Sequence, residues 1–115
     1  MASLDMNGSY DLNSEVINDL IKEGEYGNYA YGDINPKTGG FIVKYVGRSD
    51  GDLRNRIKHG IGKYSKFKFS IAKNAKEAFE KECKNYYDFE PEDNNIHPDR
   101  PKGTNYKCPC CDTFD

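Results

Sequence analysis

Two extended runs around a turn constrain the fold of this chain most strongly. Residues 29–34 (YAYGDI) and 40–47 (GFIVKYVG) are rich in aromatic and β-branched side chains. Between them, NPKTG (35–39) supplies Asn, Pro and Gly, the residues that favour turns. This pattern predicts a β-hairpin. The run KFKFSI at 66–71 alternates polar and apolar residues and predicts a third strand.

Three other segments have the periodicity of amphipathic helices. The first covers residues 13–24, with Asn13 or Ser14 as its cap and Gly24 as its stop. The second begins near Asp52 and covers residues 52–65. The apolar side chains that we expect on the inner faces of these two helices are Val16, Ile17, Leu20 and Ile21 in the first, and Leu53, Ile57 and Ile61 in the second.

The third predicted helix covers residues 74–89. Asn74 is its expected N-cap, and Glu77, three residues later, completes a capping box. The inward stripe of this helix consists of Ala78, Phe79, Cys83 and Tyr86.

The order of these elements predicts an α+β domain on a small three-stranded antiparallel sheet flanked by helices. A length of 115 residues suits one domain. We expect residues 1–24 to be an N-terminal extension with a short helix, loose over residues 1–12. Residues 25–90 would form the domain, and residues 91–115 an irregular tail rich in Pro, Asp and Asn.

The sequence predicts a cytoplasmic protein without a membrane partner. No apolar run approaches the roughly twenty residues that span a bilayer. The start, MASLDMNGSYDLNSE, has neither the basic flank nor the apolar core of a secretion signal. In a reducing compartment the four cysteines would be thiols or metal ligands rather than disulfides.

Charge is distributed unevenly along the chain, although the net charge is only -2. Residues 1–43 hold two basic and seven acidic side chains, residues 44–84 hold twelve and five, and residues 85–115 hold three and seven. The central part could therefore attract phosphates through its local field and through counterion release. The alternative is a solvated, lysine-rich surface.

A strand carrying tyrosine is followed by a turn, a second strand ending in YVGRS (45–49), a helix containing LRNRIKH (53–59), a third strand and a helix with a glutamate. This order resembles the GIY-YIG nucleases over about half of the chain, from Tyr29 to Tyr86. The first half-motif is not written Gly-Ile-Tyr. Its candidates are GNY, ending at Tyr29, and YAY, ending at Tyr31, and the distance to the turn favours Tyr31.

The resemblance implies a metal-dependent endonuclease that hydrolyses phosphodiester bonds in DNA. Glu82 would bind one divalent cation, magnesium or manganese, with Glu77 and Glu80 as weaker rivals. Tyr31 would lie near the attacking water, with Tyr45 beside it. Because an ordinary phenol has a pKa near 10, cations would have to favour its ionised form.

By the same resemblance, Arg56 would hold phosphate oxygens with its guanidinium group. His59, one helical turn further on, would donate to the leaving group or to phosphate. Gly47 would let the backbone approach the substrate closely. The other predicted nucleic-acid contacts are Lys44, Arg48, Ser49, Arg54 and Lys58.

Each assignment has a structural alternative. Tyr31 and Tyr45 could form a cross-strand aromatic pair, and His59 could stand at a helix C-terminus because the helix dipole favours it there. Arg56 and Glu82 could be solvated helix residues. The second hypothesis is therefore a noncatalytic nucleic-acid-binding or protein-interaction module with the same fold.

The tail contains KCPCC, in which Cys108 and Cys111 have the CxxC spacing of a zinc knuckle. Cys83 and His97 are the available partners, so a structural zinc ion could attach the tail to the last helix. The alternative is free thiols. The sequence does not distinguish DNA from RNA, and specificity could come from a homodimer or from a partner protein.

Overall fold

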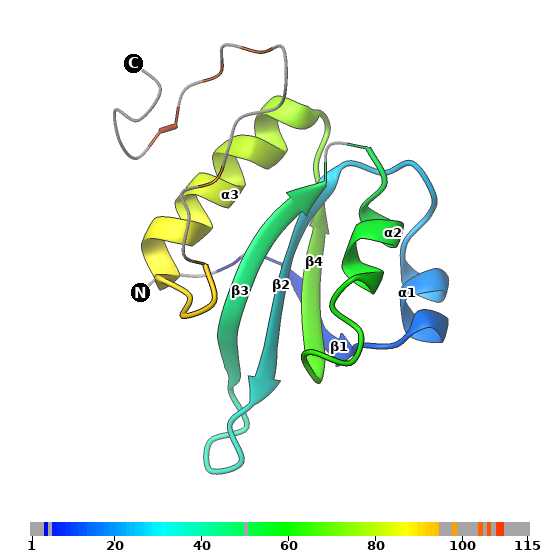
Figure 1. Ribbon diagram of the computed structural model, residues 1–115, viewed down its shortest axis with the longest axis vertical. Coiled ribbons are helices and arrows are strands. Elements are labelled where there is room, and N and C mark those ends of the chain that lie inside the picture. Colours follow the sequence, from blue (N-terminus) through cyan, green and yellow to red (C-terminus); the bar gives the residue numbers. More distant parts are fainter. Residues whose placement is uncertain are drawn as a thin grey trace.

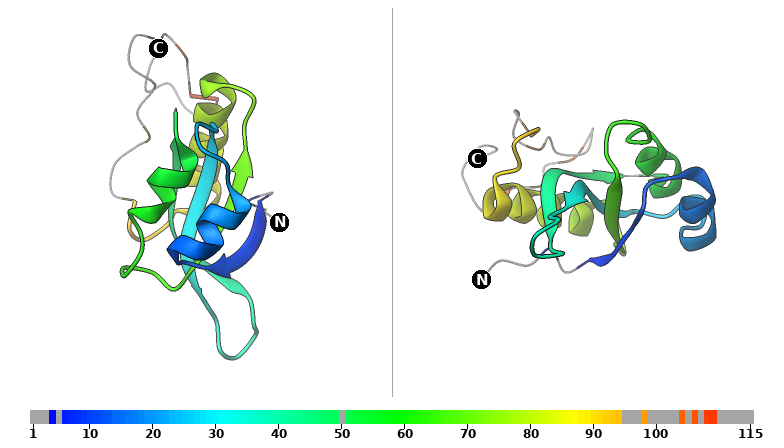
Figure 2. Two further views of the ribbon diagram at one scale, coloured as in Figure 1. Left: turned by 90° about the vertical axis from the view of Figure 1, so that its right-hand side faces the viewer. Right: turned by 90° about the horizontal axis from the view of Figure 1, so that it is seen from below.

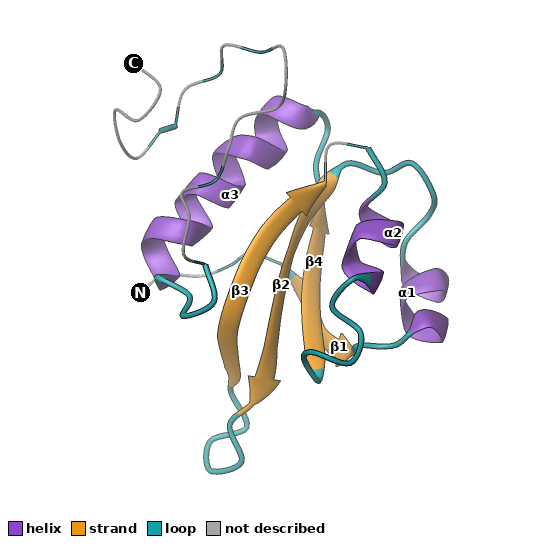
Figure 3. Cartoon of the chain, in the orientation of Figure 1, coloured by secondary structure: helices purple, strands orange, loops and turns teal. Residues whose placement is uncertain are grey.

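An antiparallel sheet organises the computed structural model, which describes Leu4, residues 6–49 and 51–94, and Pro98, Thr104, Tyr106, Cys108 and Pro109. Within these residues the sheet has four strands in the order β1-β4-β2-β3 (Figure 1). The strands are β1 (Asn7–Asp11), β2 (Gly27–Ile34), β3 (Phe41–Ser49) and β4 (Lys66–Ile71). The helices are α1 (Ser14–Leu20), α2 (Leu53–Lys58) and α3 (Ala75–Phe89) (Figure 3).

The α+β class and the antiparallel sheet are confirmed, but the expectation of three strands and a loose start is wrong. Residues Asn7–Asp11 form an edge strand that pairs with β4. The Tyr10 ring lies 5.7 Å from Phe67 and 5.9 Å from Phe69. Backbone pairing and the two ring contacts of Tyr10 hold this strand in place, and neither produces an alternating pattern in a short polar segment.

The predicted hairpin is confirmed. Strands β2 and β3 pair from Gly27 opposite Ser49 to Ile34 opposite Phe41, with one irregularity after Tyr31. In the turn, the Asn35 side chain accepts a hydrogen bond from the Lys37 amide at 2.9 Å, as turn-forming asparagines do.

Helices cover both faces of the sheet. The alternation along β2 sends Tyr29 and Tyr31 toward α1 and α2, where they join a core with Ile17 and Ile57. Asn28 points the other way, and its amide donates to the Ala78 carbonyl of α3 at 2.8 Å. Helix α3 thus lies on one face, and α1 and α2 lie on the other (Figure 2).

Helix α2 is shorter than the sequence predicts. It ends at Lys58, and a chain reversal through Gly60 and Gly62 (φ +89°) leads into β4. Leu53 and Ile57 are buried as expected, whereas Ile61 is exposed. In α1, Ile17 is buried but Leu20 is exposed, and the C-cap residue Ile21 is buried.

Helix α3 begins as predicted, with the Asn74 side chain accepting from the Glu77 amide at 2.8 Å. The Glu77 carboxylate accepts from the Lys73 amide at 3.4 Å, one residue before the cap. Ala78, Phe79 and Cys83 are buried, together with Glu82 and Asn85, while Tyr86 is partly buried.

The helices in the described part of the chain are all too short or too polar to cross a bilayer.

Strand β1 can be tested through Tyr10. We expect Tyr10→Ala to lower the free energy of unfolding by about 2 kcal/mol, because it removes apolar contact and two ring contacts. Tyr26→Ala, at a ring that is 38% exposed, should cost less than half as much. Urea unfolding measures both, and equal losses would contradict the packing of β1.

Candidate active site

A surface pocket of about 320 Å³ lies beside α2, and four of the five predicted catalytic residues line it. Its walls come from β2, β3, α2 and the loop between α2 and β4. The lining residues are Tyr29, Tyr31, Tyr45, Arg56, His59, Gly60, Lys63 and Tyr64.

Three phenol rings form the floor of this pocket. Tyr31 stands opposite Tyr45 in the β2–β3 register, with ring centroids 5.9 Å apart. Tyr29 lies 4.9 Å from Tyr31 and 6.3 Å from Tyr45. Both candidates for the first half-motif therefore belong to one aromatic cluster.

The two candidate tyrosines use their hydroxyl groups differently. Tyr31 donates to the Ile57 carbonyl at 2.9 Å and to the Arg56 carbonyl at 3.3 Å, so its hydroxyl anchors the C-terminal end of α2. The Tyr29 hydroxyl instead accepts a hydrogen bond from Nε of Arg56 at 3.4 Å. Tyr29 is thus the phenol that meets the guanidinium group.

Gly47 makes room for Tyr29. A Cβ atom at position 47 would lie 2.4 Å from Cζ and from the hydroxyl oxygen of Tyr29, so any side chain there would displace the ring. In the structure, the space beside Gly47 holds the Tyr29 ring. Gly60 has the same relation to Tyr31, whose Cζ would lie 2.4 Å from a Cβ at position 60.

The buried phenols resist ionisation. Burial raises the pKa of Tyr29 to about 12, although the contact with Arg56 lowers it in part. Burial, followed by the neighbouring phenols, raises the pKa of Tyr31 as well. The surrounding groups therefore do not produce the ionised phenol that the mechanism implied by the resemblance requires.

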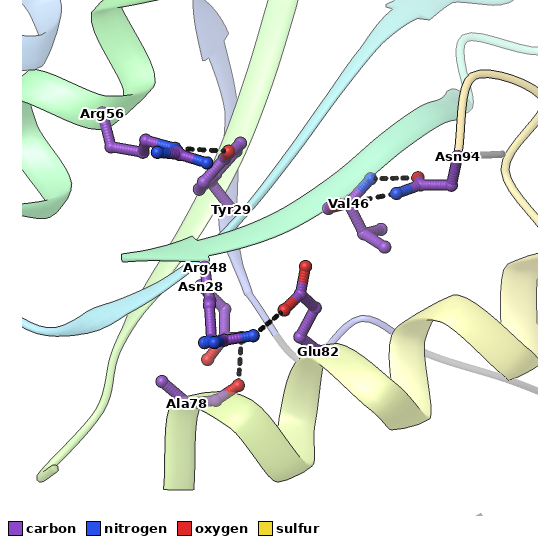
Figure 4. Close-up of polar contacts among 8 residues, drawn as sticks. All are labelled: Asn28, Tyr29, Val46, Arg48, Arg56, Ala78, Glu82 and Asn94. Atoms are coloured by element: carbon purple, nitrogen blue, oxygen red, sulfur yellow. Dashed lines mark hydrogen bonds and ion pairs between the residues drawn. The ribbon is translucent and has the colours of Figure 1, made fainter. Parts of the chain in front are cut away.

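Glu82, the fifth predicted catalytic residue, lies on the other face of the sheet. Its Oε1 accepts from the Arg48 guanidinium at 2.6 Å, and each side chain is only about a tenth exposed. Arg48 also stands 5.2 Å above the Phe79 ring. Figure 4 shows this pair beneath β3, while Tyr29 and Arg56 lie above it. Glu82 is still close enough to contribute to the raised pKa of Tyr29.

In this conformation the surroundings of Glu82 do not fit a divalent cation. One carboxylate oxygen holds a guanidinium group, and a cation in that place would meet a like charge. The described residues contain no cluster of three or more His, Cys, Asp or Glu side chains that could hold a metal.

Three predicted nucleic-acid contacts are engaged with carboxylates. Arg48 holds Glu82, Lys44 holds Glu92 at 2.6 Å, and Arg54 holds Glu23 at 3.1 Å. Of the others, Ser49 is buried, and Lys58 lies outside the phenol pocket, near Asp52 and Arg54.

The predicted zinc ligands are described in part. Cys83 and Cys108 are both buried in one cluster with Phe79, and Tyr106 packs against it. The other two predicted ligands, His97 and Cys111, lie outside the described residues. Of the described tail residues, Tyr106 and Cys108 thus pack against α3.

Sequence reasoning missed Gly60, Lys63 and Tyr64 as members of the pocket. The periodicity of the sequence predicts a longer helix through GIGKYS (60–65), whereas the two glycines of this segment are a signal for the loop that the structure contains.

No protein-family model matches the chain, and neither the curated proteins nor the solved structures contain a significant match.

The raised pKa of Tyr29 predicts how stability depends on pH. The unfolded phenol ionises near pH 10 and the folded one near 12, so above pH 10 the unfolded state binds fewer protons and stability falls. As the pH rises from about 10 to 12, we expect the free energy of unfolding of Tyr29→Phe to fall by about 2 kcal/mol less than that of the wild type. Denaturant unfolding at each pH measures this difference. Parallel curves for the two proteins would contradict a buried, protonated Tyr29.

Proposed function

We propose that this protein is a metal-dependent endonuclease of the GIY-YIG type that cleaves phosphodiester bonds in DNA. The observation that carries the proposal is the pocket in which Tyr29, Tyr45, Arg56 and His59 converge. These residues come from three separate elements, and the YVG run supplies both a pocket tyrosine and the glycine that accommodates Tyr29. Cross-strand packing of the three rings does not by itself explain why the guanidinium group of Arg56 and the imidazole of His59 lie beside them.

The residues of the pocket suit a phosphodiester. Arg56 carries a permanent charge and is held by a neutral phenol, so its remaining N–H groups can donate to phosphoryl oxygens. The Tyr29 hydroxyl, which accepts from Arg56, can donate its own proton to the same phosphate as negative charge develops there. In hydrolysis a water oxygen bonds to phosphorus, the bond from phosphorus to the leaving sugar oxygen breaks, and one proton moves from water to that oxygen. His59, which is exposed at the pocket, is the side chain suited to transfer this proton.

The family resemblance adds a divalent cation, which supplies charge neutralisation when bound. Its expected ligand is Glu82, and the carboxylate would first have to leave Arg48.

That ion pair favours a second candidate function, a noncatalytic nucleic-acid-binding module. If Glu82 serves only to hold Arg48, the pocket binds a phosphate without cutting the strand. Under either function, specificity could come from a second copy of the chain or from a partner protein. A cytoplasmic location belongs to the same proposal.

Nicking of supercoiled plasmid separates these two functions. With magnesium or manganese we expect the wild type to nick, and EDTA to abolish nicking. Arg56→Ala, which removes the charge from the pocket, should lower the rate by about 100-fold or more. Glu82→Gln should lower it similarly, because the amide oxygen can still accept from Arg48 but binds cations poorly.

Glu80→Gln, two residues away on the same helix, is the matched control and should nick at the wild-type rate. Retarded mobility of the plasmid without nicking would support the binding module. Full activity of Glu82→Gln would remove Glu82 from the mechanism.

We also propose that a zinc ion attaches the tail to α3. The support is that Cys83 and Cys108, two of the four expected ligands, meet in one buried cluster. Thiolates are strong zinc ligands, and such a site would stabilise a segment that has little apolar content.

Metal analysis tests this proposal. We expect about one zinc per chain, and Cys108→Ser should lose the zinc and lower the melting temperature. A chelator should lower the melting temperature of the wild type but not that of Cys108→Ser. A zinc-free protein that is insensitive to the chelator would leave the two cysteines as core residues.

A further inference from the structure

The basic residues that the sequence assigns to nucleic-acid binding differ in whether they form an ion pair with an acidic side chain. Lys44, Arg48 and Arg54 each form an ion pair, the one at Arg48 being largely buried. A phosphate that binds any of these three must compete with a carboxylate. For Lys44 the competitor is also fixed, because the Asp93 amide donates to the Lys44 carbonyl at 3.0 Å, next to Glu92.

The basic residues that line the pocket are different. Arg56 donates to a neutral phenol rather than to a carboxylate. Within the described part of the chain, no ion pair involves Arg56, His59 or Lys63. Lys63 is exposed and lies on the loop after α2, across the pocket from β2 and β3.

The loop that carries Lys63 is held firmly in place. The Lys63 amide donates to the Gly60 carbonyl at 3.0 Å, and Ile61 and Tyr64 form a backbone bridge. The Tyr64 ring stacks on Tyr31 with centroids 5.0 Å apart and planes at 12°. Its hydroxyl donates to a carboxylate oxygen of Asp93 at 2.6 Å.

We propose that Lys63 binds a phosphate of the nucleic-acid backbone and that the strand runs along Arg56, His59 and Lys63 rather than along Lys44, Arg48 and Arg54. This inference rests on the proposed function. Arg56 binds the phosphate in the pocket, and Lys63 binds a neighbouring one at the rim. Tyr64 is a positioning residue, because it fixes the loop through Tyr31 and Asp93.

The salt dependence of binding tests this path. The probe is a short fluorescein-labelled DNA duplex, and anisotropy is measured in EDTA between about 50 and 200 mM salt. Lys63→Gln should reduce the slope of log K against log salt by about 0.9, which corresponds to roughly eightfold weaker binding at about 0.1 M salt. Arg56→Gln should reduce this slope by at least as much.

Lys44→Gln and Arg54→Gln are the matched controls and should leave the slope within about 0.3 of the wild type. Tyr64→Phe breaks the link to Asp93 but keeps the ring. It should weaken binding less than Lys63→Gln while keeping the wild-type slope, because no cation is lost. Far-ultraviolet circular dichroism verifies the fold of each variant.

The possible outcomes separate the two proposals. A wild type that binds the duplex, together with an unchanged slope for Lys63→Gln, would overturn the path and leave the proposed function standing. Equal losses of affinity in Lys44→Gln and Lys63→Gln would likewise overturn the path and leave the proposed function standing. A wild type that binds neither this duplex nor the same sequence as single-stranded DNA or RNA at low salt would overturn both.

Discussion

The contact between the Tyr29 ring and Gly47 is the constraint on which the candidate site depends. With no Cβ at position 47, the ring lies against the edge strand β3, where its hydroxyl meets Arg56. Arg48, the next residue of β3, points to the opposite face, where it pairs with Glu82 (Figure 4). A larger residue at position 47 would displace the Tyr29 ring.

The segment after α3 covers part of the open edge of β3. Asn94 accepts from the Val46 amide at 2.8 Å and donates to the Val46 carbonyl at 3.0 Å, so its side chain imitates a paired strand (Figure 4). Glu92 and Asp93 reach Lys44 and Tyr64 from the same segment. This arrangement protects part of an exposed edge and places acid groups beside the basic side chains of β3. Acidic side chains of this segment therefore lie close to residues of the net-positive central part of the sequence. The positive charge is confined to smaller areas of the surface than the charge counts along the sequence suggest.

Much of the fold could be predicted because the hairpin, β4 and α3 have strong local signals, such as the NPKTG turn and the Asn74 cap. The edge strand β1 could not, because its pairing with β4 depends on contacts about 60 residues away in sequence. Tyr45, Arg56 and His59 lie in one pocket, and the resemblance, rather than composition or periodicity, is what had grouped them. Periodicity and spacing do not encode tertiary geometry. They therefore could not predict the face on which Glu82 lies, its pairing with Arg48 or the presence of Lys63 in the pocket.

The central claim is that the phenol pocket binds a phosphate group through Arg56. An NMR titration with a thymidine dinucleotide tests it directly. We predict that the Nε–H signal of Arg56 and the ring signals of Tyr29 and Tyr45 shift together, and that Arg56→Gln abolishes the ring shifts. Shifts confined to residues outside the pocket, or the same ring shifts in Arg56→Gln, would contradict the claim.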